Sequence, residues 1–202
     1  MKEGWPVREI EFWFEFASNY SYLSVMRIEA AAAKCDVAVR WKPFLLGPIF
    51  RSLGWNNSPF VLQKAKGDYV WTDMTRQCRK HGLPWQRPSV FPRPSLLPAR
   101  VALVGADQPW MGDYCRRIMS LNFVDDCEID DLKRVTEVLD QLGLPAQVIL
   151  DQAQSETNKL KLRQQTETAQ ARGIFGAPTF FVGQEMFWGD DRLDDALVSA
   201  SA

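Results

Sequence analysis

Residues 9–23 read Glu-Ile-Glu-Phe-Trp-Phe-Glu-Phe-Ala-Ser-Asn-Tyr-Ser-Tyr-Leu, and the fold can be predicted outward from this stretch. Apolar side chains alternate with others from Ile10 to Phe16, and this period of two is typical of a β-strand. Ser18 then stands where a helix N-cap belongs, ahead of apolar residues that begin at Tyr22 and follow helical spacing. The sequence therefore predicts a strand that leads into a helix through a serine.

The composition limits the classes of protein that the chain can belong to. Its 202 residues suffice for one buried core, or for a core with a large insertion. Twenty-four basic residues stand against 25 acidic ones without a basic block, which argues against nucleic-acid binding. The 8 Trp and 12 Phe predict an aromatic core, and some of these rings are candidates for the walls of a site for a flat ligand.

Neither a membrane segment nor a redox motif is visible in the sequence. No run approaches the roughly 20 apolar residues of a membrane span, so we expect no membrane partner. Met1–Pro6 lacks the apolar segment of a secretory signal, and we expect a cytoplasmic protein. The absence of a Cys-x-x-Cys pair argues against dithiol chemistry and against a metal site, and favours free thiols. The four cysteines are Cys35, Cys78, Cys115 and Cys127.

The two ends of the chain predict one α/β unit. Val37–Phe44 alternates like a strand, after a helix that runs through the alanines at 30–33 and ends near Cys35, so the first third is a β-α-β unit with parallel strands. A long helix over Ser155–Arg172 precedes a hairpin of Thr179–Val182 and Glu185–Trp188, and a closing helix follows Gly189.

Residues 45–154 predict a helical block without strands. An irregular connection comes first, because Gly and Pro recur up to Pro59. Five helical stretches are then expected, namely Phe60–His81, Leu96–Gly105, Gly112–Phe123, Asp130–Leu142 and Ala146–Gln154. The order of elements predicts an α/β protein with a thioredoxin-like fold (β-α-β … α-β-β-α) and a large all-helical insertion. Residues 1–44 and 155–202 form the thioredoxin-like domain in this interpretation, and residues 45–154 form the insertion.

In thioredoxin-like folds, the junction of the first strand and helix carries a redox cysteine pair, whereas Ser18 offers a hydroxyl. A thiolate brought by a ligand could take the same place over the helix N-terminus. A free thiol has a pKa of roughly 8.5, and both a hydroxyl donor and a helix N-terminus favour the thiolate and lower that pKa. Serine is also simply a good N-cap, so the residues alone leave both roles open.

Four blocks of the sequence together resemble one family, the 2-hydroxychromene-2-carboxylate isomerases, which group with the kappa-class glutathione transferases in the Dsb-type branch of thioredoxin-like proteins. Each block is weak alone, but all four occur in order at the family spacing and span nearly the whole chain. They are the Ser-x-Tyr-Ser-Tyr-Leu segment that ends at Leu23, then Pro43–Gly47, then Asn57 through Lys66–Tyr69 to Asp73 and Arg76, and finally Gly176–Phe180 with Trp188–Leu193.

The resemblance implies that Ser18 is the catalytic residue and that glutathione is the cofactor. It implies a cis bond before Pro178, with the backbone of Ala177 paired to the tripeptide, and a carboxylate bound by Lys66. The implied glutathione-binding residues are Asn57, Lys66, Ala177, Pro178, Asp190 and Asp191. Simpler interpretations exist, since acids favour a helix N-terminus and Asn57 and Lys66 suit a solvated surface. The sole histidine, His81, has no partner motif, and Ser18 lies outside a Gly-x-Ser-x-Gly elbow.

Asn19 departs from the family, which usually has proline after the serine. Its amide adds a polar group beside the sulfur position, so we expect Asn19, together with Lys66, to contact the substrate. The implied activity is glutathione-dependent cis–trans isomerisation of 2-hydroxychromene-2-carboxylate or a similar aromatic 2-oxo acid, in the breakdown of aromatic compounds. The alternatives are a kappa-type transferase that conjugates electrophiles, and a non-catalytic thioredoxin-like binding module. The family resemblance also implies a homodimer.

Overall fold

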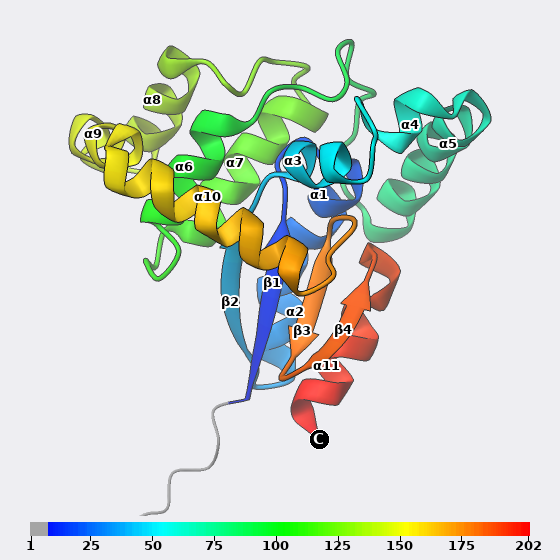
Figure 1. Cartoon of the computed structure of the whole chain (residues 1–202). Coiled ribbons are helices and arrows are strands. Elements are labelled where there is room, and N and C mark those ends of the chain that lie inside the picture. Colours follow the sequence, from blue (N-terminus) through cyan, green and yellow to red (C-terminus); the bar gives the residue numbers. More distant parts are fainter. Residues whose placement is uncertain (1–7) are drawn as a thin grey trace, which may run out of the picture.

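The computed structural model describes residues 8–202 and contains one mixed four-stranded sheet (Figure 1). Met1–Pro6, on which the expectation about a secretory signal rests, lies outside the described residues. The strand order is β2-β1-β3-β4, with β1 parallel to β2 and antiparallel to β3. The strands are β1 (Glu9–Phe14), β2 (Ala38–Pro43), β3 (Thr179–Val182) and β4 (Glu185–Trp188). The predicted thioredoxin-like order is confirmed.

The helices fall into those of the thioredoxin-like part and those of the insertion (Figure 1). The first group is α1 (Asn19–Val25), α2 (Ile28–Lys34), α10 (Glu156–Ala171), the short 3-10 helix η1 (Asp190–Arg192) and α11 (Leu193–Ser201). The insertion holds α3 (Leu46–Ser52), α4 (Pro59–Leu62), α5 (Lys64–His81), α6 (Leu96–Val104), α7 (Met111–Phe123), α8 (Leu132–Gln141) and α9 (Ala146–Gln154). No strand occurs between residues 45 and 154, all of which the structure describes.

Both faces of the sheet are covered, with α2 and α11 on one side and α10 on the other (Figure 1). Phe12 is fully buried in the main core, where its ring stacks on Phe180 at 5.3 Å between centroids. Trp13 points to the opposite face and packs with Phe181 in a second cluster. Glu11, also on this face, pairs with Arg172 at the end of α10. The alternation in β1 therefore separates two buried faces rather than a buried and a solvated one.

The helical insertion lies over the carboxyl ends of β1 and β2 and shares the main core with the sheet (Figure 1). Phe14 of β1, Met119 of α7 and Val135 of α8 all belong to one cluster of buried residues. Because the insertion and the sheet share one core, we expect the two parts to fold together. The boundaries at residues 45 and 154 remain a prediction.

The structure differs from the sequence expectations at several boundaries. The strand β1 ends at Phe14 rather than Phe16, because the chain turns at residues 15–18. A break at residues 26–27 divides the single helix expected before β2 into α1 and α2. The connection expected to be irregular contains α3, whose Pro48 lies in the first turn, where a missing N–H costs no helical hydrogen bond.

The helix expected over Phe60–His81 is two helices that meet at Gln63, whose backbone is extended. Gly67 allows the close approach of α4 to α5, since a Cβ atom there would lie 2.0 Å from the carbonyl oxygen of Phe60. This contact gives a physical reason for the glycine in the third family block. The corner places Phe60 of α4 at the wall of the pocket described below.

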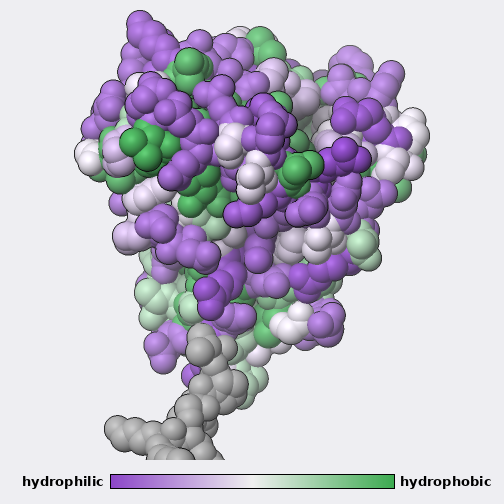
Figure 2. Space-filling model, turned by 60° about the vertical axis from the view of Figure 1, so that its left-hand side comes forward, coloured by the Kyte–Doolittle hydropathy of each residue, from purple (hydrophilic) through white to green (hydrophobic). Residues whose placement is uncertain are grey.

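The outer face that carries α9 and α10 is mainly hydrophilic (Figure 2). Figure 2 shows a face, with α9 and α10 on it, where hydrophobic residues form small separate groups among hydrophilic ones. Val148 and Leu160 are exposed hydrophobic residues of these two helices. Within residues 8–202, no helix is both long and apolar enough to cross a membrane.

Candidate active site

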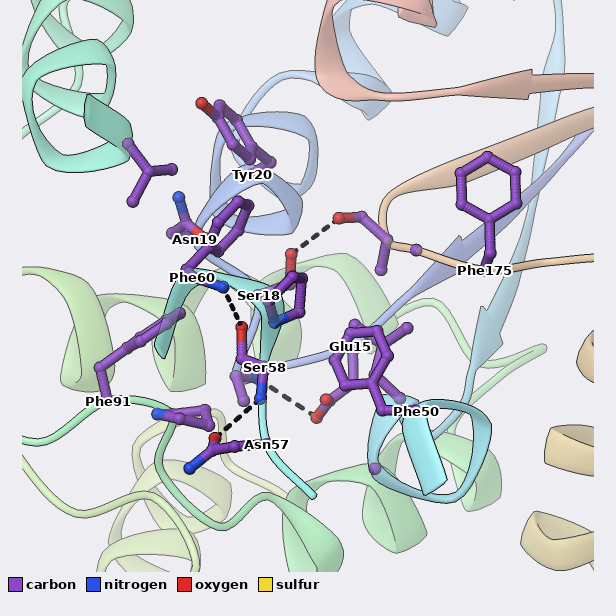
Figure 3. Close-up of a pocket in the computed structure, with 18 of the residues that line it drawn as sticks. Glu15, Ser18, Asn19, Tyr20, Phe50, Asn57, Ser58, Phe60, Phe91 and Phe175 are labelled. Atoms are coloured by element: carbon purple, nitrogen blue, oxygen red, sulfur yellow. Dashed lines mark hydrogen bonds between the residues drawn. The ribbon is translucent and has the colours of Figure 1, made fainter. Parts of the chain in front are cut away.

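A pocket of about 1050 Å³ opens where the turn after β1 meets the helical insertion. The structure brings most of the predicted site residues to its wall, namely Ser18, Asn19, Asn57, Lys66, Ala177, Asp190 and Asp191. Pro178 follows Ala177 but is not among the lining residues. The apolar part of the wall combines aliphatic side chains with the rings of Phe and Trp residues, of which Figure 3 labels Phe50, Phe60, Phe91 and Phe175. The rings are Phe50, Trp55, Phe60, Phe91, Phe175 and Trp188.

Ser18 is both a helix cap and a pocket residue. Its Oγ accepts a hydrogen bond from the backbone N–H of Ser21 at 3.2 Å, so it is the N-cap of α1. The same hydroxyl donates to the carbonyl oxygen of Ala177 at 2.8 Å (Figure 3). A thiolate is an anionic acceptor and forms a stronger hydrogen bond than a carbonyl. The hydroxyl can therefore turn from Ala177 to a ligand sulfur while its oxygen still caps the helix.

The loop that receives this hydrogen bond is held firmly on the sheet. The Ala177–Pro178 peptide bond is cis, as predicted. The carbonyl of Pro178 accepts from the N–H of Gly189 at 3.0 Å, and Thr179 Oγ1 donates to the carbonyl of Gly176 at 2.9 Å. A Cβ atom on Gly176 would lie 2.4 Å from Nε1 of Trp188, so a larger residue there would displace the Trp188 ring. These contacts fix the backbone of Ala177 opposite Ser18.

Asn19 is the first residue of α1 and is fully buried. Neither its amide nitrogen nor its amide oxygen has a hydrogen-bond partner among the described residues. It lies next to Phe60 and Tyr20 at the pocket wall (Figure 3). An unpaired buried polar group costs about 1–3 kcal/mol, so the amide of Asn19 is expected to lower the stability of the fold.

Asn19→Pro is expected to raise the free energy of unfolding by at least about 1 kcal/mol, because it removes both unpaired amide atoms. Proline suits the first position of α1, and the preceding residue has the extended backbone that proline requires (Ser18, φ −85°, ψ 117°). Urea unfolding of both proteins measures the difference. Glu156→Pro is the matched control, because Glu156 is the first residue of α10 after another serine cap and is exposed. Equal gains in the two variants would show that the amide of Asn19 carries no penalty.

The two adjacent aspartates have different environments. Asp190 is buried, and its Oδ1 accepts from Ser24 Oγ and from Arg27 Nη2, each at 2.8 Å. Its charge is thus already paired within the protein. Asp191 is 75% exposed and lies 3.3 Å from the guanidinium of its neighbour Arg192. Asp191 therefore keeps a carboxylate free to bind a ligand ammonium, and the ligand contact of either aspartate stays a prediction.

Lys66 and Asn57 approach the pocket from α5 and from the loop before α4. Lys66 Nζ lies 5.7 Å from the ring centroid of Phe60, and no ion pair of Lys66 is found within residues 8–202. The Oδ1 atom of Asn57 accepts from the N–H of Ser58 at 2.7 Å, which leaves the NH₂ group of Asn57 to donate (Figure 3). Both side chains are thus available to an anionic ligand.

Glu15 is a pocket residue that the sequence analysis missed. The alternation from Ile10 to Phe16 predicts only that Glu15 continues the strand on the face opposite Phe14, but Glu15 follows the strand and is 7% exposed. Its Oε1 accepts from the hydroxyl of Ser95 and, at 3.3 Å, from the N–H of Ala17. Burial raises the pKa of Glu15, and this effect exceeds the lowering by the hydrogen bonds from Ser95, Ala17 and Leu46. The only sequence signal was a carboxylate directly before the strand–helix junction.

The raised pKa of Glu15 predicts a pH-dependent stability. The folded state binds the proton of Glu15 more tightly than the unfolded state, in which the pKa is about 4.5. The contribution of Glu15 to the free energy of unfolding is therefore complete below the unfolded pKa and is lost as pH rises through the raised folded pKa. Urea unfolding across this range should show the decline in the wild type and its absence in Glu15→Gln. Parallel pH profiles for the two proteins would contradict the raised pKa.

The protein's own thiols and its histidine lie outside the pocket. All four cysteines are free, with Cys78 and Cys115 buried, and burial raises the pKa of Cys78 to about 11. Burial and the charge of Arg27 lower the pKa of His81. In the part of the chain that the structure describes, no three His, Cys, Asp or Glu side chains are grouped to hold a metal ion. A thiol that reacts beside Ser18 must therefore come from a ligand.

A thioredoxin-like sheet with serine, rather than a cysteine pair, at the junction of β1 and α1 defines a Dsb-type protein without its own dithiol. The chain belongs to the family of DSBA-like thioredoxin domains, whose model matches residues 9–199. It is 27% identical to a 2-hydroxychromene-2-carboxylate isomerase of Sphingobium xenophagum over 192 residues, which cover 93% of this chain and 95% of that protein. It is 23% identical to glutathione S-transferase kappa 1 of Rattus norvegicus over 201 residues, or 93% of this chain and 88% of that protein.

Solved structures show the same fold. A 2-hydroxychromene-2-carboxylate isomerase superposes with a TM-score of 0.84 at 25% identity, covering 95% of this chain and 93% of that chain. The cytosolic disulfide reductase DsbM from Pseudomonas aeruginosa, solved with GSH, superposes with a TM-score of 0.65 at 16% identity. That alignment covers 95% of this chain and 96% of DsbM, and it shows a shared fold.

Proposed function

We propose that this protein is a glutathione-dependent cis–trans isomerase that acts on 2-hydroxychromene-2-carboxylate or a similar aromatic 2-oxo acid in aromatic-compound catabolism. The observation that carries the proposal is the Ser18 hydroxyl at the pocket wall, where it donates a hydrogen bond to the carbonyl oxygen of Ala177 at 2.8 Å. The names of the Sphingobium isomerase and of the rat kappa transferase support the same assignment. We also propose that the protein works in the cytoplasm, since its four free cysteines suit a reducing compartment.

The residues around Ser18 fit glutathione, a peptide-like anion with one ammonium group. Asn19 lies at the pocket wall with both amide atoms unpaired, and a small movement of its side chain would let them bind the ligand. Lys66 offers a cation for a carboxylate, and exposed Asp191 offers an anion for the ammonium. The backbone of Ala177 is fixed at the pocket wall for a strand-like contact. Bound glutathione would supply a thiolate that adds reversibly to a conjugated double bond and so allows the bond to rotate.

Ser18 would hold that sulfur through its hydroxyl. The helix that follows has seven residues, so we assign the stabilisation of the thiolate to the hydroxyl rather than to the dipole of α1. The oxygen of Ser18 stays fixed by the N–H of Ser21, while its proton leaves the carbonyl of Ala177 for the sulfur. The residue thereby positions the nucleophile without a change in the helix cap.

The remaining space suits a flat aromatic acid. The volume of about 1050 Å³ reaches the upper end of small-molecule sites, about 300–1,000 Å³, so a cofactor and a substrate can be present together. Phe50, Phe60 and Phe91 project into this space and can sandwich a fused ring (Figure 3). Lys66 and the amide of Asn19 would bind the substrate carboxylate or glutathione.

An assay of the purified protein tests the proposal and separates it from a kappa-type transferase. The absorbance of 2-hydroxychromene-2-carboxylate is followed with and without a small amount of glutathione. We expect conversion to the trans product only with glutathione, and free glutathione should be recovered at the end. Stoichiometric loss of glutathione with an electrophile would favour the transferase. No conversion, together with no calorimetric binding at millimolar glutathione, would contradict both activities and favour a binding module.

A further inference from the structure

The turn between β1 and α1 presents two polar side chains to the pocket in different directions. The hydroxyl of Ser18 points to the loop that contains Phe175, whereas the carboxyl of Glu15 lies on the other side, towards Ser58 and Phe50 (Figure 3). The hydroxyl of Ser18 is the hydrogen-bond donor that we assign to the sulfur of glutathione. Glu15 faces the helical insertion, where the aromatic walls leave room for the second ligand.

The side chain of Ser95 forms a hydrogen bond to Glu15 and does not cap its helix. It is the N-cap residue of α6, but its side chain makes no capping hydrogen bond. Its hydroxyl donates instead to Oε1 of Glu15, and Ser95 is itself 7% exposed at the pocket wall. Loss of a serine cap costs about 1 kcal/mol. The hydrogen bond to Glu15 therefore replaces one that would have stabilised α6.

The environment of Glu15 favours the protonated form of its carboxyl group. No ion pair of Glu15 is found within residues 8–202, and its pKa is raised by burial. When Glu15 is protonated, we place its proton on Oε2, because Oε1 already accepts from Ser95 and Ala17. Protonated Glu15 would thus offer Oε2 as a proton donor, next to the Ser95 hydroxyl that is hydrogen-bonded to Oε1.

The proposed substrate requires both a proton donor and a proton acceptor before it can isomerise. In a 2-hydroxychromene the double bond lies inside a six-membered ring, where it cannot become trans, so the cyclic hemiketal must open before any isomerisation. Opening adds a proton to the ring oxygen and removes one from the hydroxyl on the same carbon. A neutral carboxyl group can do both, because it gives a proton from one oxygen and receives one on the other.

We propose, on the basis of the function proposed above, that Glu15 and Ser95 catalyse the opening of the substrate's cyclic hemiketal. Oε2 of Glu15 gives its proton to the ring oxygen as the bond between that oxygen and C2 breaks. The hydroxyl on C2 gives its proton to Ser95 Oγ, and its O–H electrons form the C2 carbonyl. Ser95 passes its own proton to Oε1, so Glu15 ends neutral and no further reactant is needed.

Racemisation of the chromene without glutathione tests this proposal. The hemiketal carbon is a stereocentre that ring opening makes planar, so opening and closure erase the circular dichroism of one resolved enantiomer. We expect the wild-type protein to accelerate this loss by about 10²–10⁴-fold over buffer, the usual range for general acid–base catalysis. Glu15→Gln should lose at least about 100-fold of this acceleration, and Ser95→Ala about tenfold. Glu11→Gln, which changes a β1 carboxylate outside this pocket, should keep the wild-type rate.

The possible outcomes are distinct. A wild-type protein that does not accelerate racemisation, or a folded Glu15→Gln variant that does so at the wild-type rate, overturns the role of Glu15. If Glu15→Gln does not fold, Ser95→Ala and Glu15→Asp decide, because unchanged racemisation in both also overturns it. Racemisation without a trans product in the presence of glutathione contradicts the proposed function alone. A trans product without accelerated racemisation contradicts only the role of Glu15 and Ser95.

Discussion

Ser18→Ala is expected to lower the turnover of 2-hydroxychromene-2-carboxylate by about 10²–10³-fold, which corresponds to about 2.7–4 kcal/mol for one donor to a reacting anion. The affinity for glutathione should change much less, because Asn57, Lys66 and Asp191 would bind the rest of the tripeptide. Steady-state kinetics and calorimetry of the two proteins measure both quantities. Unchanged turnover would show that Ser18 is only the cap of α1.

A matched control is needed, because Ser18→Ala also removes a helix cap. Ser155 is the N-cap of α10, where its Oγ accepts from the N–H of Asn158, and it lies outside the pocket. Ser155→Ala should therefore cost about 1 kcal/mol of stability, as any lost serine cap does, and leave turnover unchanged. A fall in turnover in this variant would mean that stability, rather than the hydroxyl at the site, limits activity.

Asp190→Ala is expected to lower the free energy of unfolding by about 3–5 kcal/mol, because it leaves Arg27 without its partner. The ion pair is only 18% and 6% exposed on its two sides, and Ser24 completes it. Urea unfolding measures the loss. The double variant Arg27→Met, Asp190→Leu should recover most of it, since both charges are then removed.

The same experiment separates the two adjacent aspartates. Asp191 is exposed, so Asp191→Ala should leave the stability nearly unchanged and weaken glutathione binding. Asp190→Ala should change the stability first and affect binding through the position of η1. A stability loss below about 1 kcal/mol for Asp190→Ala would contradict the structural role assigned to its ion pair.

Much of the fold could be predicted from local patterns. The alternation around Phe12 and the hairpin at Thr179–Val182 and Glu185–Trp188 gave strands that the structure confirms. The cis bond at Ala177–Pro178 followed from the family resemblance and is present. Glycine and proline positions predicted the ends of most helices of the insertion to within a few residues.

The environment of Glu15 could not be predicted, because it depends on distant parts of the chain. The period of two assigns side chains to faces, but it does not say which face another element covers. Ser95 lies 80 residues further along, and only the insertion brings it to Glu15. The unpaired amide of Asn19 could not be predicted either, because it depends on how Phe60 of α4 packs beside the start of α1 (Figure 3).

The ionisation of the thiol of bound glutathione tests the central claim most directly. Its thiolate is followed by ultraviolet absorbance as pH is varied, in complexes of the wild type and of Ser18→Ala. We predict a pKa below the roughly 8.5 of a free thiol in the wild-type complex, and a return towards that value in Ser18→Ala. The same pKa in both complexes, or no complex at millimolar glutathione, would contradict the assignment of Ser18 as the residue that holds the reacting sulfur.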